Sequence, residues 1–457
     1  MGELLIKMSR WGLLFAIVML NLGLVAQEAD NEFTIDAKLN TRGEIRVGGF
    51  QPDSVDNQRK AQFITGIYQF NFGYKRSWLE VRLSPKASGV WGSSSANLSL
   101  AEGWVSMQSK KGPFAKVGRQ SLEYDDERIL GYDDWSMTAP THDALKFGYE
   151  GYGHKIHLIL TYNQDSKNSD QGGDYYSGGL QPYKTMQTIW YHYDTPKSFF
   201  GISLIAMNIG MQNMSFNSSG PKTLFQQLYG TYMKLQPKYT TIEGAFYYQT
   251  GREEFNIPLA AFMGSFKFNF KPNDIFSVYG GYDYLSGDKY FAIPPEGAVG
   301  LILHDTIRGF NSIFGSHHDF YGAMDFFYLD SYVGDFTPGL QNAYVGGTVN
   351  PVKNLKIDAS YHFYAITADL KRLKKPLGHE VELSAEYKFV DFVKLSAGYS
   401  FMMGTKTMEI LQRVSENRQL HWGWIMLSVK PTIFTYAWND KKKVKGLEGY
   451  AVTRLHG

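Results

Sequence analysis

The feature that most constrains the fold is a long-range alternation of apolar and polar residues. From Phe33 to Val47 the odd positions are mostly apolar, and charges fall on the even positions Asp36, Lys38, Arg42, Glu44 and Arg46. The same period of two recurs in residues 79–84, 355–363, 380–389 and 393–401. Successive side chains of a strand point to opposite faces, so each stretch predicts a strand with one apolar and one charged face. The first stretch is also long compared with the usual globular strand of about 5–6 residues.

The connections between these stretches alternate between short and long. Short polar turns are predicted at 75–77, 110–113, 151–153, 194–197, 237–238, 272–274, 351–354 and 390–392. Long polar connections are predicted at 122–141, 163–183, 210–222, 286–338 and 405–419. This asymmetry is typical of an up-and-down transmembrane β-barrel with tight periplasmic turns and large outer loops. Enforcing the alternation gives an all-β antiparallel barrel of about eighteen strands, an even number as in bacterial barrels.

One stretch does not fit this count. Residues 318–328 have the composition of a strand, but the parity of the connections leaves no place for a further spanning strand. We assign this stretch to the large outer loop 286–338, as a β-extension above the membrane. A soluble β-propeller or jelly roll is the alternative fold, and it leaves the charged face of so many long strands unexplained.

The membrane environment explains why the sheet is expected to close into a barrel. A bilayer core offers no hydrogen-bond partners, so a β-structure crosses it only when every strand is paired. At about eighteen strands the interior is too wide for side chains to fill, which predicts a lumen filled by water or by loops. The charged faces of the strands are expected to line that lumen.

The first 26 residues are interpreted as a targeting segment. Lys7 and Arg10 precede an apolar run from Trp11 to Val25, and the small residue Ala26 follows. This layout predicts a secretory signal peptide at 1–26, and an uncleaved membrane anchor is the alternative. The expected organisation is then a barrel at 27–434 in the outer membrane of a Gram-negative type of envelope, in contact with its lipids, and a C-terminal tail at 435–457.

Composition excludes several other functions. The chain has 46 Lys+Arg and 44 Asp+Glu, so it lacks the basic excess of a nucleic-acid-binding protein. It has no Cys, which removes disulfides, thiolate metal sites and a Cys nucleophile. Its 11 His show no metal-ligand spacing, and no nucleophile elbow or phosphate loop is present. We therefore expect no enzyme activity, no metal and no cofactor.

Charges on the predicted lumen face differ between the two parts of the chain. The first part carries more cations than anions, and the last third carries more anions, including Glu380, Glu382 and Glu386. Rings or rows of charged side chains set ion preference in pores, although such charges could instead pair within the wall. The predicted pore-lining residues are Arg42, Glu44, Arg46, Glu80, Arg82, Arg119, Arg128 and Lys146.

One segment departs from the repeating pattern. It reads GRQSLEYDDERILG over residues 118–131, with Trp135 soon after and a strand that begins near Asp143. Arg119 and Arg128 lie here among several acidic residues, which predicts that they pair with those carboxylates and fold the loop inward. The loop motif comprises Tyr124, Asp125, Asp126, Glu127, Trp135 and Asp143. A Ca²⁺ site of Asp125, Asp126 and Glu127 is an alternative, but the spacing of an established calcium loop is absent.

This motif resembles the alginate-export family of outer-membrane porins. The resemblance also includes the opening strand LNTRGEIR at 39–46 and the run HHDFYGAMDF at 317–326, and it extends over most of the chain after residue 26. It implies an eighteen-stranded monomeric barrel with an arginine-rich, anion-selective pore that passes an acidic polysaccharide outward. The positions that fall on the matching motifs are Arg42, Arg46, Arg119 and Arg128.

The expected function is therefore a channel for anionic or uronic-acid-type oligosaccharides and small anions. A general porin with little selectivity is the first alternative, because the basic and acidic walls oppose one another. A barrel enzyme or an adhesin that uses the outer loops is the second alternative.

Overall fold

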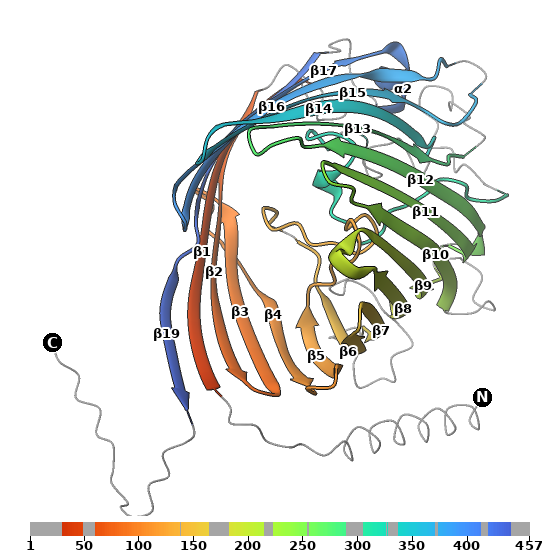
Figure 1. The fold of residues 1–457 in the computed structure, drawn as a ribbon. Helices are drawn as coiled ribbons and strands as arrows, with labels where there is room; N and C mark the ends of the chain where they lie inside the picture. The colour runs from red at the N-terminus through yellow and green to blue at the C-terminus, as the bar shows by residue number, and fades with distance from the viewer. Residues whose placement is uncertain are drawn as a thin grey trace, which may run out of the picture.

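The computed structural model describes residues 30–48, 60–137, 139–163, 182–213, 223–253, 256–288, 305–325, 327, 337–370, 373–412 and 419–439. The predicted signal peptide, most of loop 163–183 and the chain beyond residue 439 lie outside these ranges. The described chain is almost entirely β-sheet (Figure 1). Its strands are β1 (Asp30–Val47), β2 (Ala61–Arg76), β3 (Leu79–Val90), β4 (Asn97–Gln108), β5 (Pro113–Gln120), β6 (His142–Gly151), β7 (His154–Tyr162), β8 (Thr185–Asp194), β9 (Phe200–Gln212), β10 (Thr223–Leu235), β11 (Thr240–Arg252), β12 (Pro258–Phe270), β13 (Phe276–Leu285), β14 (Leu340–Val352), β15 (Leu355–Ala365), β16 (Pro376–Val390), β17 (Val393–Gly404), β18 (Gln419–Val429) and β19 (Thr432–Asn439).

The sheet closes on itself as a barrel of eighteen strands. From β1 to β18 each strand pairs antiparallel with the next in sequence, and β1 closes the sheet by pairing also with β18 and β19. β18 and β19 face successive halves of β1 in the same direction, so they form one spanning strand interrupted at Lys430 and Pro431. Proline lacks the N–H that a ladder needs, which explains the interruption. The predicted barrel is confirmed, but its last strand runs to Asn439 and does not end at Phe434 as the sequence analysis expected.

The two ends of the barrel differ as predicted. At one end, turns of two to five residues join β2 to β3, β4 to β5 and each later pair of this kind up to β16 and β17. At the other end lie the long connections, of which the one from β13 to β14 is the longest. The described helices are the short 3₁₀ helices η1 (Pro196–Ser198) and η3 (His317–Asp319) and the helix α2 (Lys406–Gln412). None of these described helices is long and apolar enough to cross a bilayer.

The outward face of the wall is apolar. Leu383 and Ile425 are each 53% exposed at the middle of their strands, and Leu39, Ile189 and Leu204 are similarly exposed. The residues between them in sequence point inward, for example Lys38, Asn40 and Glu44, which are buried. Apolar side chains that stay exposed on every side of a closed barrel suit a hydrocarbon solvent. The predicted assignment of the two strand faces is therefore confirmed.

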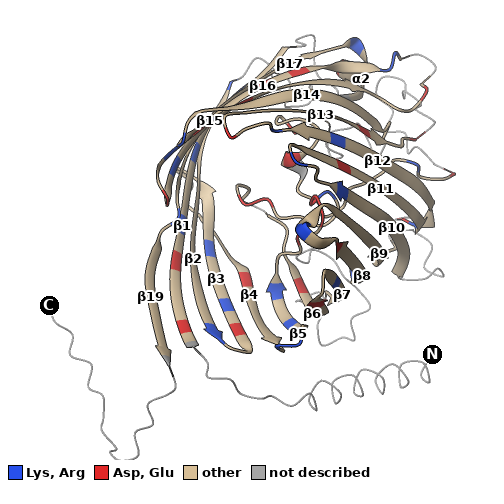
Figure 2. Cartoon of the chain, viewed as in Figure 1, with Lys and Arg blue, Asp and Glu red and all other residues tan. Residues whose placement is uncertain are grey.

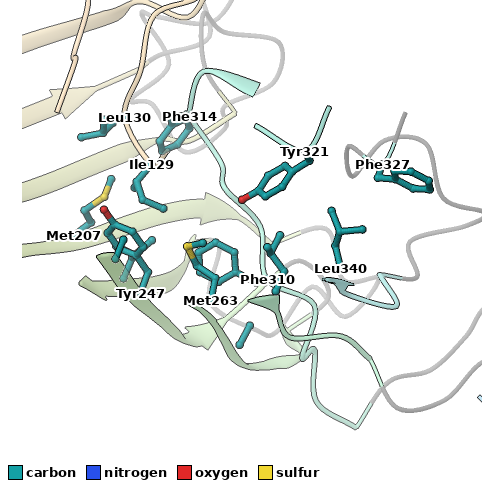
Figure 3. Close-up of a cluster of buried hydrophobic side chains, with 14 of the residues drawn as sticks. Ile129, Leu130, Met207, Tyr247, Met263, Phe310, Phe314, Tyr321, Phe327 and Leu340 are labelled. Carbon is teal, nitrogen blue, oxygen red and sulfur yellow. The ribbon is translucent and has the colours of Figure 1, made fainter. Parts of the chain in front are cut away.

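The inward face of β7 to β12 is a finding that the sequence analysis missed. Ile159, Met207, Tyr247 and Met263 point inward on these strands, yet they are buried rather than wetted by a lumen. They pack against Leu130, Phe310 and Phe314 from the connections after β5 and β13 (Figure 3). Part of the barrel interior is thus a packed hydrophobic core, and only the rest of the wall is lined by polar residues.

Candidate functional site in the barrel lumen

Two segments of the long connections fold into the barrel interior. We call residues 121–137, after β5, the first inner segment and residues 305–325, after β13, the second inner segment; both lie inside the ring of strands in Figure 1. They are joined by backbone hydrogen bonds from Gly131 N to Phe314 O (3.0 Å) and from Ser316 N to Glu127 O (2.9 Å). The expectation that residues 318–328 form a β-extension above the membrane is wrong for their described part. This part holds the end of η3 and turns, and its polar groups bond to Arg128 of the first inner segment and to Glu380 and Glu382 of the wall.

Arg128 connects the first inner segment to the wall. Its Nε lies 3.2 Å from Asp126 Oδ2, and its Nη1 lies 3.1 Å from Asp283 Oδ1 on β13. Nη1 also donates to the Tyr321 hydroxyl at 3.0 Å, so Arg128 contacts the second inner segment as well. Burial alone would lower the pKa of Arg128, but the carboxylates of Asp283 and Asp126 raise it well above its ordinary value. The predicted pairing of Arg128 with the acidic motif is confirmed.

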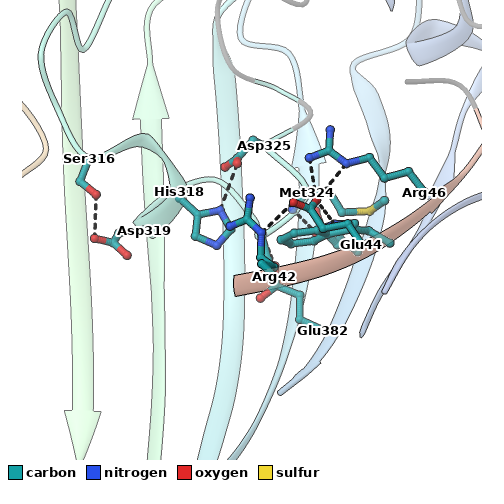
Figure 4. A network of polar contacts seen from close by, with 12 residues as sticks. Arg42, Glu44, Arg46, Ser316, His318, Asp319, Met324, Asp325 and Glu382 are labelled. Atoms are coloured by element: carbon teal, nitrogen blue, oxygen red, sulfur yellow. Dashed lines mark hydrogen bonds and ion pairs between the residues drawn. The ribbon is translucent and has the colours of Figure 1, made fainter. Parts of the chain in front are cut away.

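The second inner segment is held by carboxylates of β16. Glu382 Oε1 accepts from Ala323 N at 2.7 Å, and Glu380 Oε1 accepts from Met324 N at 3.0 Å. Glu380 is fully buried and also accepts from the Tyr364 hydroxyl. Two of the predicted lumen anions thus bind the protein's own backbone. Figure 4 labels Met324 and Glu382 of this anchor together with Arg42, Glu44 and Arg46 of β1.

The tip of the first inner segment lies on β1. The guanidinium of Arg42 stacks over the Trp135 ring at 3.7 Å, a cation–π contact that a flat indole favours. Arg42 Nε also donates to Glu44 Oε1 at 2.7 Å, and Arg46 Nη2 to Glu44 Oε2 at 2.9 Å. The two β1 arginines predicted to attract solute therefore share one carboxylate.

Asp134 forms the second contact of this tip. Its carboxylate pairs with Lys38 of β1 and with Lys430 at the break between β18 and β19. Burial would raise the pKa of Asp134, but the two ammonium groups outweigh burial and hold it below its ordinary value. Lys86 of β3 donates to Met137 O at 3.0 Å. Three lysines of the wall thus surround the acidic tip.

Other residues of the loop motif, Tyr124, Asp125 and Glu127, each have a different partner. Tyr124 places its hydroxyl 2.9 Å from His157 Nδ1, and Asp125 Oδ1 accepts from Trp190 Nε1 at 3.1 Å. Glu127 Oε2 accepts from Tyr132 N at 3.1 Å. The three carboxylates considered for Ca²⁺ therefore do not converge, and within the described ranges no group of three His, Asp or Glu could hold a metal ion.

Arg119 does not line the lumen. It forms a bidentate ion pair with Asp143 of β6: Nε donates to Oδ1 at 2.9 Å and Nη2 donates to Oδ2 at 2.8 Å. Both residues share the face of Val117, which is 50% exposed on the outside of the barrel, whereas Lys116 and Gln120 point inward. The expected pairing of Arg119 with the loop carboxylates is corrected, because alternation along β5 turns its side chain away from them.

The lower wall of β3 to β6 holds further charges. Arg82 Nε lies 2.9 Å from Glu102 Oε2, and Glu80 lies exposed on the same inward face. Lys116 and Lys146 are cross-strand neighbours, and no described carboxylate forms an ion pair with either of them. Lys116 Nζ lies 3.7 Å from the centre of the Trp104 ring instead. Basic and acidic residues alternate around this wall rather than separating cleanly (Figure 2).

Sequence reasoning missed some residues of the site. Glu102, Lys116 and Lys430 were not singled out, although Glu102 and Lys116 lie on inward faces that a correct register would have revealed. Lys430 carried no such signal, since it lies at a strand break that depends on Pro431.

Two cavities remain beside the inner segments. One, of ≈ 350 Å³, lies against β1 to β4 and is lined by Lys38, Gln69, Asn71, Tyr132, Asp134 and Lys430 among others. The other, of ≈ 600 Å³, lies against β10 to β16 and is lined by several tyrosines and carboxylates, including Tyr279, Asp283, Tyr344 and Asp358. Both cavities offer hydrogen-bonding groups, which suits polar solutes.

Comparison with known proteins defines the fold. No protein-family model and no curated protein sequence matches this chain. Among solved structures, it is similar to Pseudomonas aeruginosa OccK9 (OpdG), with a TM-score of 0.56 and 13% identity over 88% of this chain and 98% of that one. It is also similar to P. aeruginosa OccK2 (OpdF) in complex with glucuronate, with a TM-score of 0.58 and 11% identity over 88% and 98% of the two chains.

A third similar structure is a BenF-like porin from Pseudomonas fluorescens Pf-5. The TM-score is 0.58, with 12% identity over 88% of this chain and 99% of the porin. At such low identity the likeness establishes the fold alone, which is that of eighteen-stranded outer-membrane porins. The alginate-export family named from the sequence motif is not among these three structures.

Proposed function

We propose that this protein is an outer-membrane channel for small anions and for sugars or short oligosaccharides that carry carboxylates. The observation that carries the proposal is a closed barrel with an apolar outside and an inside that combines charged strands with two polar cavities. An apolar exterior favours insertion in a bilayer, and a polar interior favours passage of hydrated solutes. The outer-membrane location agrees with the predicted signal peptide 1–26.

The carboxylate preference is the finer part of the proposal. It is supported by Lys116 and Lys146, which face the lumen without an ion-paired carboxylate among the described residues, and by Lys38 and Lys430, which already bind a carboxylate. It also agrees with the glucuronate bound to the structurally similar OccK2 and with the likeness of the GRQ…ER…G…W motif to alginate-export porins. Alginate-like uronic-acid chains belong to this solute class. A monomeric channel is part of the same proposal.

A weakly selective general porin is the second candidate. It is favoured by the partial neutralisation of the arginines, since Arg42 and Arg46 share Glu44 and Arg82 pairs with Glu102, which leaves one net positive charge among these five side chains. An ion pair within the wall presents little net charge to a passing solute. The two candidates differ in selectivity and agree on conduction.

Recording from single channels separates them. The purified protein in a planar bilayer should conduct, and D-glucuronate should reduce the current at concentrations where glucose does not. Replacing Arg42, Arg46 and Arg82 together by Gln should leave Glu44 and Glu102 without cations and shift the reversal potential toward cation preference. The general porin is favoured if glucuronate and glucose reduce the current equally and the reversal potential of wild type under a KCl gradient is near zero.

A further inference from the structure

The point where Asp134 meets the wall has the properties of a ligand site. Lys38 and Lys430 approach one carboxylate from the two strands that close the barrel, β1 and the strand formed by β18 and β19. Lys38 Nζ also donates to the backbone carbonyl of Asp134 at 2.6 Å. Charge-assisted hydrogen bonds of this kind are about twice as strong as neutral ones. The wall therefore holds a two-lysine clamp in which a carboxylate is already seated.

The seated carboxylate is accessible to exchange. The side chain of Asp134 is 50% exposed and that of Lys430 is 47% exposed, whereas Lys38 is only 8% exposed. The buried lysine is thus a fixed part of the wall, whereas the aspartate belongs to a connection and not to a strand of the barrel. Replacing one carboxylate by another leaves the charge of the clamp unchanged, so the exchange carries no penalty for an unpaired buried ammonium group.

A polar cavity of ≈ 350 Å³ adjoins the clamp. Gln69 lines it and is 6% exposed, and its Oε1 has no hydrogen-bond partner in the described part of the chain. A buried acceptor without a donor costs free energy, so a donor from a ligand would be stabilised there. Three other carboxylates of the cavity are already engaged: Asp36 by Thr432, Glu102 by Arg82 and Glu123 by Ser121.

We propose that Lys38 and Lys430 form a subsite for the carboxylate of a sugar acid, that Asp134 occupies it at rest, and that the sugar hydroxyls are bound in the cavity by Gln69. The carboxylate of the solute exchanges with that of Asp134, and the tip of the first inner segment leaves the wall as it does so. This inference deepens the proposed channel function and rests on it for the route by which solute arrives. The binding step itself is independent of conduction.

Asp134→Asn gives the primary test. It keeps the size of the side chain and removes the resident carboxylate, so both lysines become available to the probe, D-glucuronate. If Asp134 occupies the clamp about nine-tenths of the time, its removal lowers the apparent dissociation constant about tenfold. Isothermal titration of detergent-solubilised full-length protein measures this constant without any requirement for current. Asp143→Asn is the matched control, because it removes the same charge on the outside of the barrel and should leave glucuronate binding unchanged.

The lysines give the opposite test. Lys38→Gln with Lys430→Gln should abolish glucuronate binding, and Lys430→Gln alone, at a half-exposed position, should weaken it in a barrel that keeps its wall intact. Glucose binding should not respond to any of these changes. If wild type and Asp134→Asn bind glucuronate equally, or if the lysine variants bind it as well as wild type, the subsite is overturned while the channel proposal stands. If wild type carries no current yet Asp134→Asn binds glucuronate more tightly, the channel proposal fails and the subsite stands.

Discussion

Arg128 Nη1 lies 3.1 Å from Asp283 Oδ1, and the two side chains are only 4% and 2% exposed. One belongs to a connection and the other to the barrel wall, so this buried ion pair holds the first inner segment inside the lumen. Isolated charges are costly to bury, and each of these two depends on its partner. The width of the lumen is therefore set by the position of the inner segments as well as by the number of strands.

Breaking this pair should release the first inner segment. Arg128→Met leaves the buried carboxylate of Asp283 and the partly exposed carboxylate of Asp126 without their cation, and it should destabilise the docked segment by about 3–5 kcal/mol. Adding Asp283→Asn should recover part of that loss, because one of the orphaned charges is then removed. Limited proteolysis of the folded protein reports the release as new cleavage between residues 121 and 137. Equal protection in wild type and Arg128→Met would show that the apolar contacts alone hold the segment.

Removing the segment should widen the lumen. Deletion of Tyr124 to Asp134 takes away the Arg128 anchor, the Asp134 contact and part of the interior apolar core. Single-channel conductance should therefore rise above that of wild type. A conductance that stays the same would place the narrowest point elsewhere.

Docking of the segment should depend on pH. Burial raises the pKa of Asp133 from 3.8 to about 6, with His318 opposing this shift and Asp319 and Asp325 adding to it. The docked state then binds more protons than the released state between pH 4 and 6, so docking weakens as pH rises through this window. Cleavage of the segment should increase from pH 5 to pH 7. Asp133→Asn should flatten this change, and a profile that is unaltered in the variant would show that Asp133 is not the group responsible.

Adjacent residues of β16 should differ in how much stability a new charge costs. Leu383 is 53% exposed on the outward face, and Ser384 points inward and lines the larger cavity. Arg at position 383 should cost about 2–4 kcal/mol if it meets the bilayer midplane. Arg at position 384 meets water and should cost far less. Denaturant titration of both variants in liposomes measures the difference, and similar losses would argue against the assignment of the faces.

The barrel could be predicted from the sequence because apolar and polar residues alternate with a period of two. This alternation indicates which face of each strand contacts lipid. Leu383 and Glu382 reveal the two faces of β16 by composition alone. Register is a separate matter: Arg119 has the composition of a lumen residue, but its position on β5 turns it outward. A polar residue near the rim of a strand therefore says little about the lumen.

The inner segments were harder to predict because their partners lie far away in sequence. The acidic motif indicated that its loop folds inward, yet the cation of Arg128 meets Asp283, and Asp134 meets Lys430. The apolar inward faces of β7 to β12 carried the missing signal, since residues such as Met207 and Met263 need a cover inside the barrel. No local pattern identifies that cover as residues 305–325.

The most direct test of the channel proposal is the reversal potential of the wild-type protein under a tenfold KCl gradient in a planar bilayer. We expect discrete current steps with a reversal potential of the sign given by chloride permeation. At the same tenfold ratio, that potential should be smaller at high salt, near 1 M, where the screening length is about 3 Å, than at low salt, near 0.01 M, where it is about 30 Å. Absence of current steps would contradict the channel. Steps with a reversal potential of the opposite sign would contradict the preference for anions and carboxylate-bearing solutes.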